Sequence, residues 1–106
     1  MSRYGIERAC YDLRDEANRR LFKATPEDFL ARYPLSPEER AQIMQGDVGA
    51  LFAADVAAGA IGELMRTFDY DMATYVAKVR ETLRLPPDES QLAILRARAG
   101  GRKRFT

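Results

Sequence analysis

The 106-residue chain contains no histidine and a single cysteine, and these two shortages remove most routes to catalysis. Zinc and iron sites are built mainly from histidine and cysteine side chains, with carboxylates as partners. One thiol and scattered acids do not supply such a set, so we expect no metal site and no catalytic residue in this chain. The lone Cys10 cannot form an internal disulfide, which favours a reducing compartment. Its place on an apolar helix face predicts a core residue.

Long apolar runs and strand patterns are also missing. The longest apolar stretch is broken by Asp55 and by glycines, so we expect no membrane-spanning segment, and the N-terminal residues lack the apolar centre of a secretion signal. A cytoplasmic location is therefore the expectation. No segment alternates apolar and polar side chains over a useful length, which predicts an all-α fold without a sheet.

The composition is that of one small globular domain, with 46% hydrophobic and 31% charged residues. Its net charge of +1 hides an asymmetry. Residues 1–95 carry 12 basic and 16 acidic side chains, whereas residues 96–106 carry five basic ones and no acid. Within this tail, Arg102, Lys103 and Arg104 are candidates for binding an anionic partner. A solubilising end is favoured over nucleic-acid binding, because these charges have no interleaved aromatic residues and no reading helix.

Helix starts and stops are dense in the first half of the chain. Apolar residues recur at steps of three and four over residues 2–22, which predicts one amphipathic helix. Thr25-Pro26 predicts a capped start for a short second helix, and Tyr33-Pro34 predicts its end. The run Ser36-Pro37-Glu38-Glu39 has the pattern of a capping box. Gly46 predicts a left-handed stop for the helix that this box begins.

The second half of the chain predicts two further helices. Asp47 can cap a helix over residues 48–66, and Asp69 or Asp71 can cap one that ends before the double proline. Glycines are frequent in the first of these. Glycine inside a helix costs about 1 kcal/mol relative to alanine, so we expect another helix to approach it closely.

The domain organisation follows from these patterns. Residues 1–85 are predicted to form a helical domain, and residues 86–106 a short helix at about 88–98 followed by the basic tail. The whole chain is thus expected to be a small bundle of five to six short helices.

Acidic residues are the remaining candidates for chemistry. The pairs Asp15-Glu16 and Glu38-Glu39 have arginines nearby and are interpreted as solvated surface. Asp69 and Asp71 are interpreted as helix caps rather than cation ligands. The glycine-containing run GDVGALF lacks the preceding strand and the lysine of a phosphate-binding loop. The sequence therefore points to a function through binding.

Several of these features occur in an order that resembles a known family. The marks are Asn18-Arg19, Phe22-Lys23-Ala24, Phe29-Leu30, Tyr33-Pro34-Leu35, the capping box at residues 36–39, and Gly46-Asp47 with Leu51. In this order and spacing the segment from Asn18 onward resembles the small, alpha-type (LigA-like) subunit of the extradiol ring-cleavage dioxygenases that include protocatechuate 4,5-dioxygenase. The resemblance covers about residues 6–84.

The resemblance implies an all-helical domain that opens no aromatic ring by itself. In that family the non-haem Fe(II) and its ligands belong to a larger subunit, and the small subunit packs over the mouth of the active site and helps to close it. Two differences make the chain more similar to stand-alone members of the superfamily. It has Asp55-Val56-Ala57 where the dioxygenase subunits have a glycine-glycine-asparagine turn, and its link from Thr67 to Asp71 is shorter.

Our first hypothesis is a non-catalytic accessory subunit, without a cofactor of its own, that packs on a larger iron-containing partner. The alternative is a stand-alone helical interaction module, self-associating or bound to a different enzyme, with no role in ring cleavage. A protein partner is expected to contact the helix predicted over residues 48–66 and the link that follows it. The candidate partner-binding residues are Asp55, Val56, Gly59, Ile61, Gly62, Phe68 and Tyr70.

Overall fold

The computed structural model describes residues 2–84, which form seven helices and no strand within that range. The all-α prediction is confirmed. Met1 and residues 85–106 lie outside the described residues, and with them the predicted helix at 88–98 and the candidate anion-binding residues Arg102, Lys103 and Arg104. The helices are α1 (Ser2–Asp12), α2 (Glu16–Ala24), α3 (Pro26–Leu30), α4 (Pro37–Met44), α5 (Val48–Ala53), α6 (Ala58–Phe68) and α7 (Met72–Leu83).

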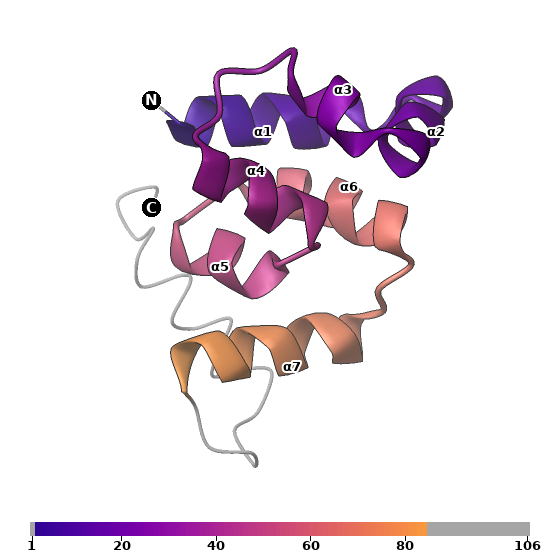
Figure 1. Cartoon of the computed structure of the whole chain (residues 1–106). Helices are drawn as coiled ribbons and strands as arrows, with labels where there is room; N and C mark the ends of the chain where they lie inside the picture. The colour runs from indigo at the N-terminus through magenta and orange to yellow at the C-terminus, as the bar shows by residue number, and fades with distance from the viewer. Residues whose placement is uncertain (1, 85–106) are drawn as a thin grey trace, which may run out of the picture.

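Helix α5 lies at the centre of the arrangement (Figure 1). It contacts α4, α6 and α7, and among the described helices its contact with α7 is the most extensive. Helix α1 packs on α6 and α4 from the opposite side, and α2 pairs with α3. The layer of α4, α5 and α6 is thus covered by α1 on one side and by α7 on the other.

The core is apolar and draws on every helix. Cys10 is fully buried in it, as predicted for a core residue. None of the described helices combines the length and the apolarity that crossing a membrane requires. The core side chains are Ile6, Ala9, Cys10, Leu13, Phe22, Phe29, Leu30, Ile43, Val48, Leu51, Phe52, Val56, Ala60, Ile61, Leu64, Val76 and Val79.

The predicted first helix is wrong at its middle, where the chain turns a corner between α1 and α2. Asp15 caps α2, because its carboxylate accepts a hydrogen bond from the backbone N–H of Ala17 in the first turn at 2.9 Å. Side chains of α2 then satisfy carbonyl groups left over at the end of α1. Asn18 Nδ2 donates to Asp12 O at 2.9 Å, and Arg19 Nη1 donates to Leu13 O at 2.8 Å. The corner is stable because Asn18 and Arg19 supply the hydrogen bonds that a continuing helix would otherwise give to these carbonyl groups.

Helix α4 begins and ends as predicted. The capping box is complete, because Glu39 N–H donates to Ser36 Oγ at 3.1 Å and Ser36 N–H donates to Glu39 Oε1 at 2.7 Å. Gly46 ends the helix with a φ of 65°, and the next N–H, of Asp47, returns to the carbonyl of Gln42 at 2.9 Å. This arrangement is the predicted left-handed stop. Asp47 then caps α5, also as predicted.

The predicted helix over residues 48–66 divides into α5 and α6. Asp55 adopts a left-handed conformation with a φ of 64°, and the N–H of Val56 returns to the carbonyl of Leu51 at 3.0 Å. This is a second left-handed stop, formed here by an aspartate instead of a glycine. The prediction of one helix is wrong because aspartate tolerates this conformation better than most residues. Seven helices result within residues 2–84, since two of the five predicted there are each split.

Two smaller predictions concern helix caps. The prediction of a capping hydroxyl at Thr25 is wrong, because that hydroxyl donates back to the carbonyl of Leu21 at 3.4 Å. Pro26 begins α3 nonetheless. Asp71 caps α7, whereas Asp69 is part of the stop that ends α6.

Close approach of another helix is found at Gly49 of α5. A Cβ added to Gly49 would lie 2.6 Å from the carbonyl oxygen of Lys78 in α7 and would collide with the hydroxyl of Thr82. Gly59 faces the hydroxyl of Tyr11, 3.0 Å from an added Cβ. Nothing lies within 4 Å of a Cβ added to Gly62, so the expected close approach of a helix within the fold does not occur there.

Candidate functional site

Aromatic side chains gather where α6 and the link to α7 meet α2 and α3. The ring of Phe22 packs edge-on against the rings of Phe29 and Phe68, with centroids 5.9 Å apart in both pairs. Phe68 also contacts Tyr70, at a centroid distance of 5.4 Å. We call Phe22, Phe29, Phe68 and Tyr70 the aromatic corner. Such edge contacts contribute about 0.5–1.5 kcal/mol each beyond area burial, so they anchor the link to the bundle.

Gly46 supports the aromatic corner from the turn between α4 and α5. A Cβ on Gly46 would lie 2.6 Å from the hydroxyl of Tyr70 and 3.0 Å from two ring carbons of Phe68. The link itself turns at Asp69, which has a φ of 59°, and Tyr70 N–H returns to the carbonyl of Met65 at 2.9 Å. The stops that end α4 and α6 therefore pack against each other. Only glycine suits this position of α4, both for its φ and for its space.

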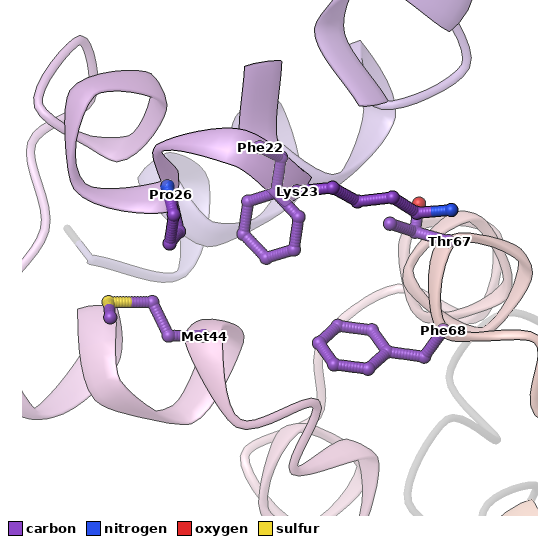
Figure 2. A pocket seen from close by; sticks show the side chains of 6 residues that line it. All are labelled: Phe22, Lys23, Pro26, Met44, Thr67 and Phe68. Carbon is purple, nitrogen blue, oxygen red and sulfur yellow. The ribbon is translucent and has the colours of Figure 1, made fainter. Parts of the chain in front are cut away.

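A pocket of about 270 Å³ opens beside the aromatic corner, where the ends of α2, α4 and α6 and the start of α3 meet (Figure 2). Figure 2 shows the rings of Phe22 and Phe68 approaching each other, with Met44 on the α4 side. The Lys23 side chain runs along the edge toward Thr67. The full lining consists of Phe22, Lys23, Pro26, Met44, Thr67 and Phe68.

The polar groups of this pocket are few. Lys23 is exposed and forms no ion pair with any other residue of the range 2–84. The hydroxyl of Thr67 donates to the carbonyl of Glu63 at 2.9 Å, so its proton is already engaged. The pocket thus combines apolar walls and two aromatic rings with a single cation.

The candidate partner-binding residues divide between the core and the surface. Val56 and Ile61 are 0% and 1% exposed, so their side chains present no surface to a partner. Gly59 and Gly62 lie on the exposed side of α6, and the space beyond Gly62 is open. A partner can therefore reach these candidates on the exposed side of α6.

The remaining candidates lie at the two ends of α6. Phe68 and Tyr70 are half-buried and pack against each other in the aromatic corner. Asp55 instead is directed toward α1, where its carboxylate lies 3.5 Å from Arg3 Nη1. Close by, the carboxylate of Glu7 accepts a hydrogen bond from the N–H of Ala57 at 2.8 Å and supplies the cap that α6 lacks from its own side chains.

Five residues of the pocket are absent from the sequence-based candidates: Phe22, Lys23, Pro26, Met44 and Thr67. Periodicity marks Phe22 and Met44 only as apolar helix positions, and it marks Lys23 as surface. The available signal is the order Phe22-Lys23-Ala24 among the marks of the family resemblance. That signal identifies a segment, while the pocket requires the ends of three helices to meet.

Two ionisable groups near the core, the Cys10 thiol and the Tyr33 hydroxyl, are held in their uncharged forms. Burial raises the pKa of the Cys10 thiol to about 12, and the nearby Glu7 carboxylate adds to the shift. A thiol with this pKa is a poor nucleophile at neutral pH. Burial and a 2.6 Å hydrogen bond to Asp12 raise the pKa of Tyr33 well above its usual value. Within residues 2–84, no three histidine, cysteine or acidic side chains lie together in a way that could hold a metal ion.

A model of one protein family matches most of the chain. The family is described as aromatic-ring-opening dioxygenase LigAB, LigA subunit, and the match covers residues 6–83. This range runs from α1 to the end of α7, so it includes the aromatic corner, the pocket and the candidate partner-binding residues. No curated protein and no solved structure matches the chain significantly.

Proposed function

The chain belongs to the LigA family of aromatic-ring-opening dioxygenase subunits, and we propose on this basis that it is a non-catalytic accessory subunit. In this role it packs on a larger, iron-containing subunit and helps to close the active site of that partner. The observation that carries the proposal is the family match over residues 6–83.

The donor atoms of the chain support this division of labour. A non-haem Fe(II) site takes imidazole and carboxylate ligands, and the whole 106-residue sequence has no imidazole to offer. The one thiol, on Cys10, is buried in the core. We therefore assign the non-haem Fe(II), its ligands and the ring-opening step to the larger subunit. The LigA-family chain contributes surface and shape.

The surface proposed to meet the larger subunit is the exposed side of α6 together with the link that follows it. Gly62 has open space above its Cα, so a partner's backbone or side chain can approach α6 closely there. Asp69 and Tyr70 continue this surface into the link. The link is held in place by the aromatic corner, so it offers a preorganised surface, and preorganisation reduces the entropy lost on binding.

Co-expression with a candidate larger subunit tests the proposal. The two chains are expected to co-purify, and the complex is expected to open its aromatic substrate faster than the larger subunit alone. An unchanged rate when this chain is omitted would rule out a role in closing the active site. A discrete self-associated form that does not bind the larger subunit would support the alternative of a stand-alone interaction module.

Two arginine variants locate the contact surface. Gly62→Arg places a long charged side chain on the exposed side of α6 and is expected to weaken the complex at least tenfold, or about 1.4 kcal/mol. Ala77→Arg makes the same change at an exposed position of α7 and serves as the matched control. Circular dichroism of both variants establishes that they fold. Equal affinity of the two variants would place the contact elsewhere on the chain.

A further inference from the structure

The pocket beside the aromatic corner is not required for the proposed accessory role, and its chemistry indicates a ligand. We propose that it binds a small carboxylate carrying a single apolar ring. The ring lies against Phe22, Met44 and Phe68, and the carboxylate pairs with the ammonium group of Lys23. The ligand is a free small molecule, and its binding does not depend on the larger subunit.

The walls of the pocket select an apolar ring. Phe22 and Phe68 meet edge-on at 5.9 Å with their planes 69° apart, and both side chains line the pocket. Aromatic rings are favourable neighbours for another ring. Met44 adds a flexible thioether, which adapts well to aromatic neighbours, and Pro26 adds a rigid apolar edge.

The volume suits a ligand of one ring with a small substituent. An engineered cavity of about 150 Å³ is large enough for benzene, and drug-sized ligands occupy pockets of roughly 300–1,000 Å³. The pocket here, at about 270 Å³, lies between these sizes. It therefore has room for a single ring and its carboxylate.

The charge at the edge selects an anion. Lys23 is the one cation of the lining and has no ion pair among residues 2–84. The nearest acids along the chain, Glu27 and Asp28 in the first turn of α3, are exposed and form no ion pair with it. Thr67 cannot donate to a ligand while its proton is engaged with Glu63. One available cation without a second donor fits a monoanion.

Methyl-labelled methionine gives a direct measurement of binding in the free chain. Met44 lines the pocket, whereas Met72 is 51% exposed on α7 and serves as an internal reference. Titration with benzoate is expected to shift the Met44 methyl resonance and to leave Met72 unchanged. For a ligand of this size the dissociation constant is expected on the order of millimolar. No shift of Met44 up to the solubility of benzoate would overturn the proposal.

Charge and position are tested with two variants and one neutral probe. Lys23→Gln is expected to weaken benzoate binding at least about threefold. Arg20→Gln removes a cation from the same helix outside the pocket and is expected to leave binding unchanged. Benzamide, a neutral analogue, is expected to bind more weakly than benzoate and to be insensitive to Lys23→Gln. Equal binding of the two probes, or equal effects of the two variants, would refute the assignment of the carboxylate to Lys23. Any of these results leaves the accessory-subunit proposal intact, because all use the chain without a partner.

Discussion

Replacing Gly49 by alanine is expected to destabilise the fold, although alanine is the better helix former. Gly49 lies in α5 at its contact with α7, where a new Cβ would be 2.6 Å from the carbonyl oxygen of Lys78 and 3.1 Å from its carbonyl carbon. The Thr82 hydroxyl, even closer, belongs to a side chain that can rotate. The main chain of α7 cannot rotate away, so the two helices must separate.

The expected loss follows from two opposed terms. Alanine in place of glycine inside a helix stabilises by about 1 kcal/mol. An extra methyl in a well-packed interface costs about 1–3 kcal/mol, and the rigid carbonyl places Gly49 toward the upper part of that range. The net expectation is a destabilisation of roughly 1–2 kcal/mol. In a domain of this size each kcal/mol corresponds to about 4–8 °C in Tm, so Tm is expected to fall by roughly 4–16 °C.

Gly62→Ala is the matched control for this prediction. It makes the same chemical change inside α6, but nothing lies within 4 Å of the new Cβ. Helix propensity then acts alone, and the free energy of unfolding is expected to rise by about 0.5–1 kcal/mol. Thermal and urea unfolding followed by circular dichroism measure both variants. Shifts of the same sign in Gly49→Ala and Gly62→Ala would refute the reasoning, because packing would then not distinguish the two glycines.

Two further predictions concern a helix cap and a partly buried hydroxyl. Ser36→Ala removes half of the capping box and is expected to lower the free energy of unfolding by about 1 kcal/mol. The control Thr25→Ala removes no cap and should change the free energy of unfolding by less than about 0.5 kcal/mol. Comparable urea midpoints for the two variants would contradict this. The raised pKa of Tyr33 means that folding favours its protonated form. Its contribution to stability is therefore present below the ordinary tyrosine pKa of about 10 and is lost as the pH rises above it. Tyr33→Phe should show a smaller loss of stability at alkaline pH than the unaltered chain, and an identical loss would exclude this role.

Helix ends that depend on neighbouring residues were predictable from the sequence. The capping box at residues 36–39, the stop at Gly46 and the cap at Asp71 each involve atoms within five positions along the chain. Their chemistry also belongs to residue types with strong preferences for these positions. The all-α class followed in the same way, from apolar spacing alone.

The two breaks within predicted helices were not predictable by the same means. The corner between α1 and α2 depends on Asn18 and Arg19, whose side chains reach back to carbonyls of the preceding helix. Apolar spacing continues through this corner and so conceals it. The stop at Asp55 has the backbone of a glycine stop without the glycine. A left-handed stop can be read from the sequence when a glycine marks it. An aspartate at the same position gives no such signal.

The candidate site was predictable only in part, because some of its residues lie close together in the chain and others meet only in the folded structure. Phe68 and Tyr70 are two positions apart in the chain and stand out as aromatic residues in a short link. Phe22, Lys23 and Met44 join them only because α2, α4 and α6 end at one place. A pocket between helix ends has no signature in local periodicity, since each helix contributes residues that look ordinary alone.

The length of the link is determined by the turn on which it rests. Gly46 ends α4 and also leaves the space that Phe68 and Tyr70 occupy, so these two roles cannot be changed independently. The residues from Thr67 to Asp71 are just enough to end α6, place two rings over Gly46 and cap α7. A longer link would have to extend beyond this contact. The short link of this chain therefore forms part of the folded bundle, and a partner that contacts it meets a surface already fixed by the turn between α4 and α5.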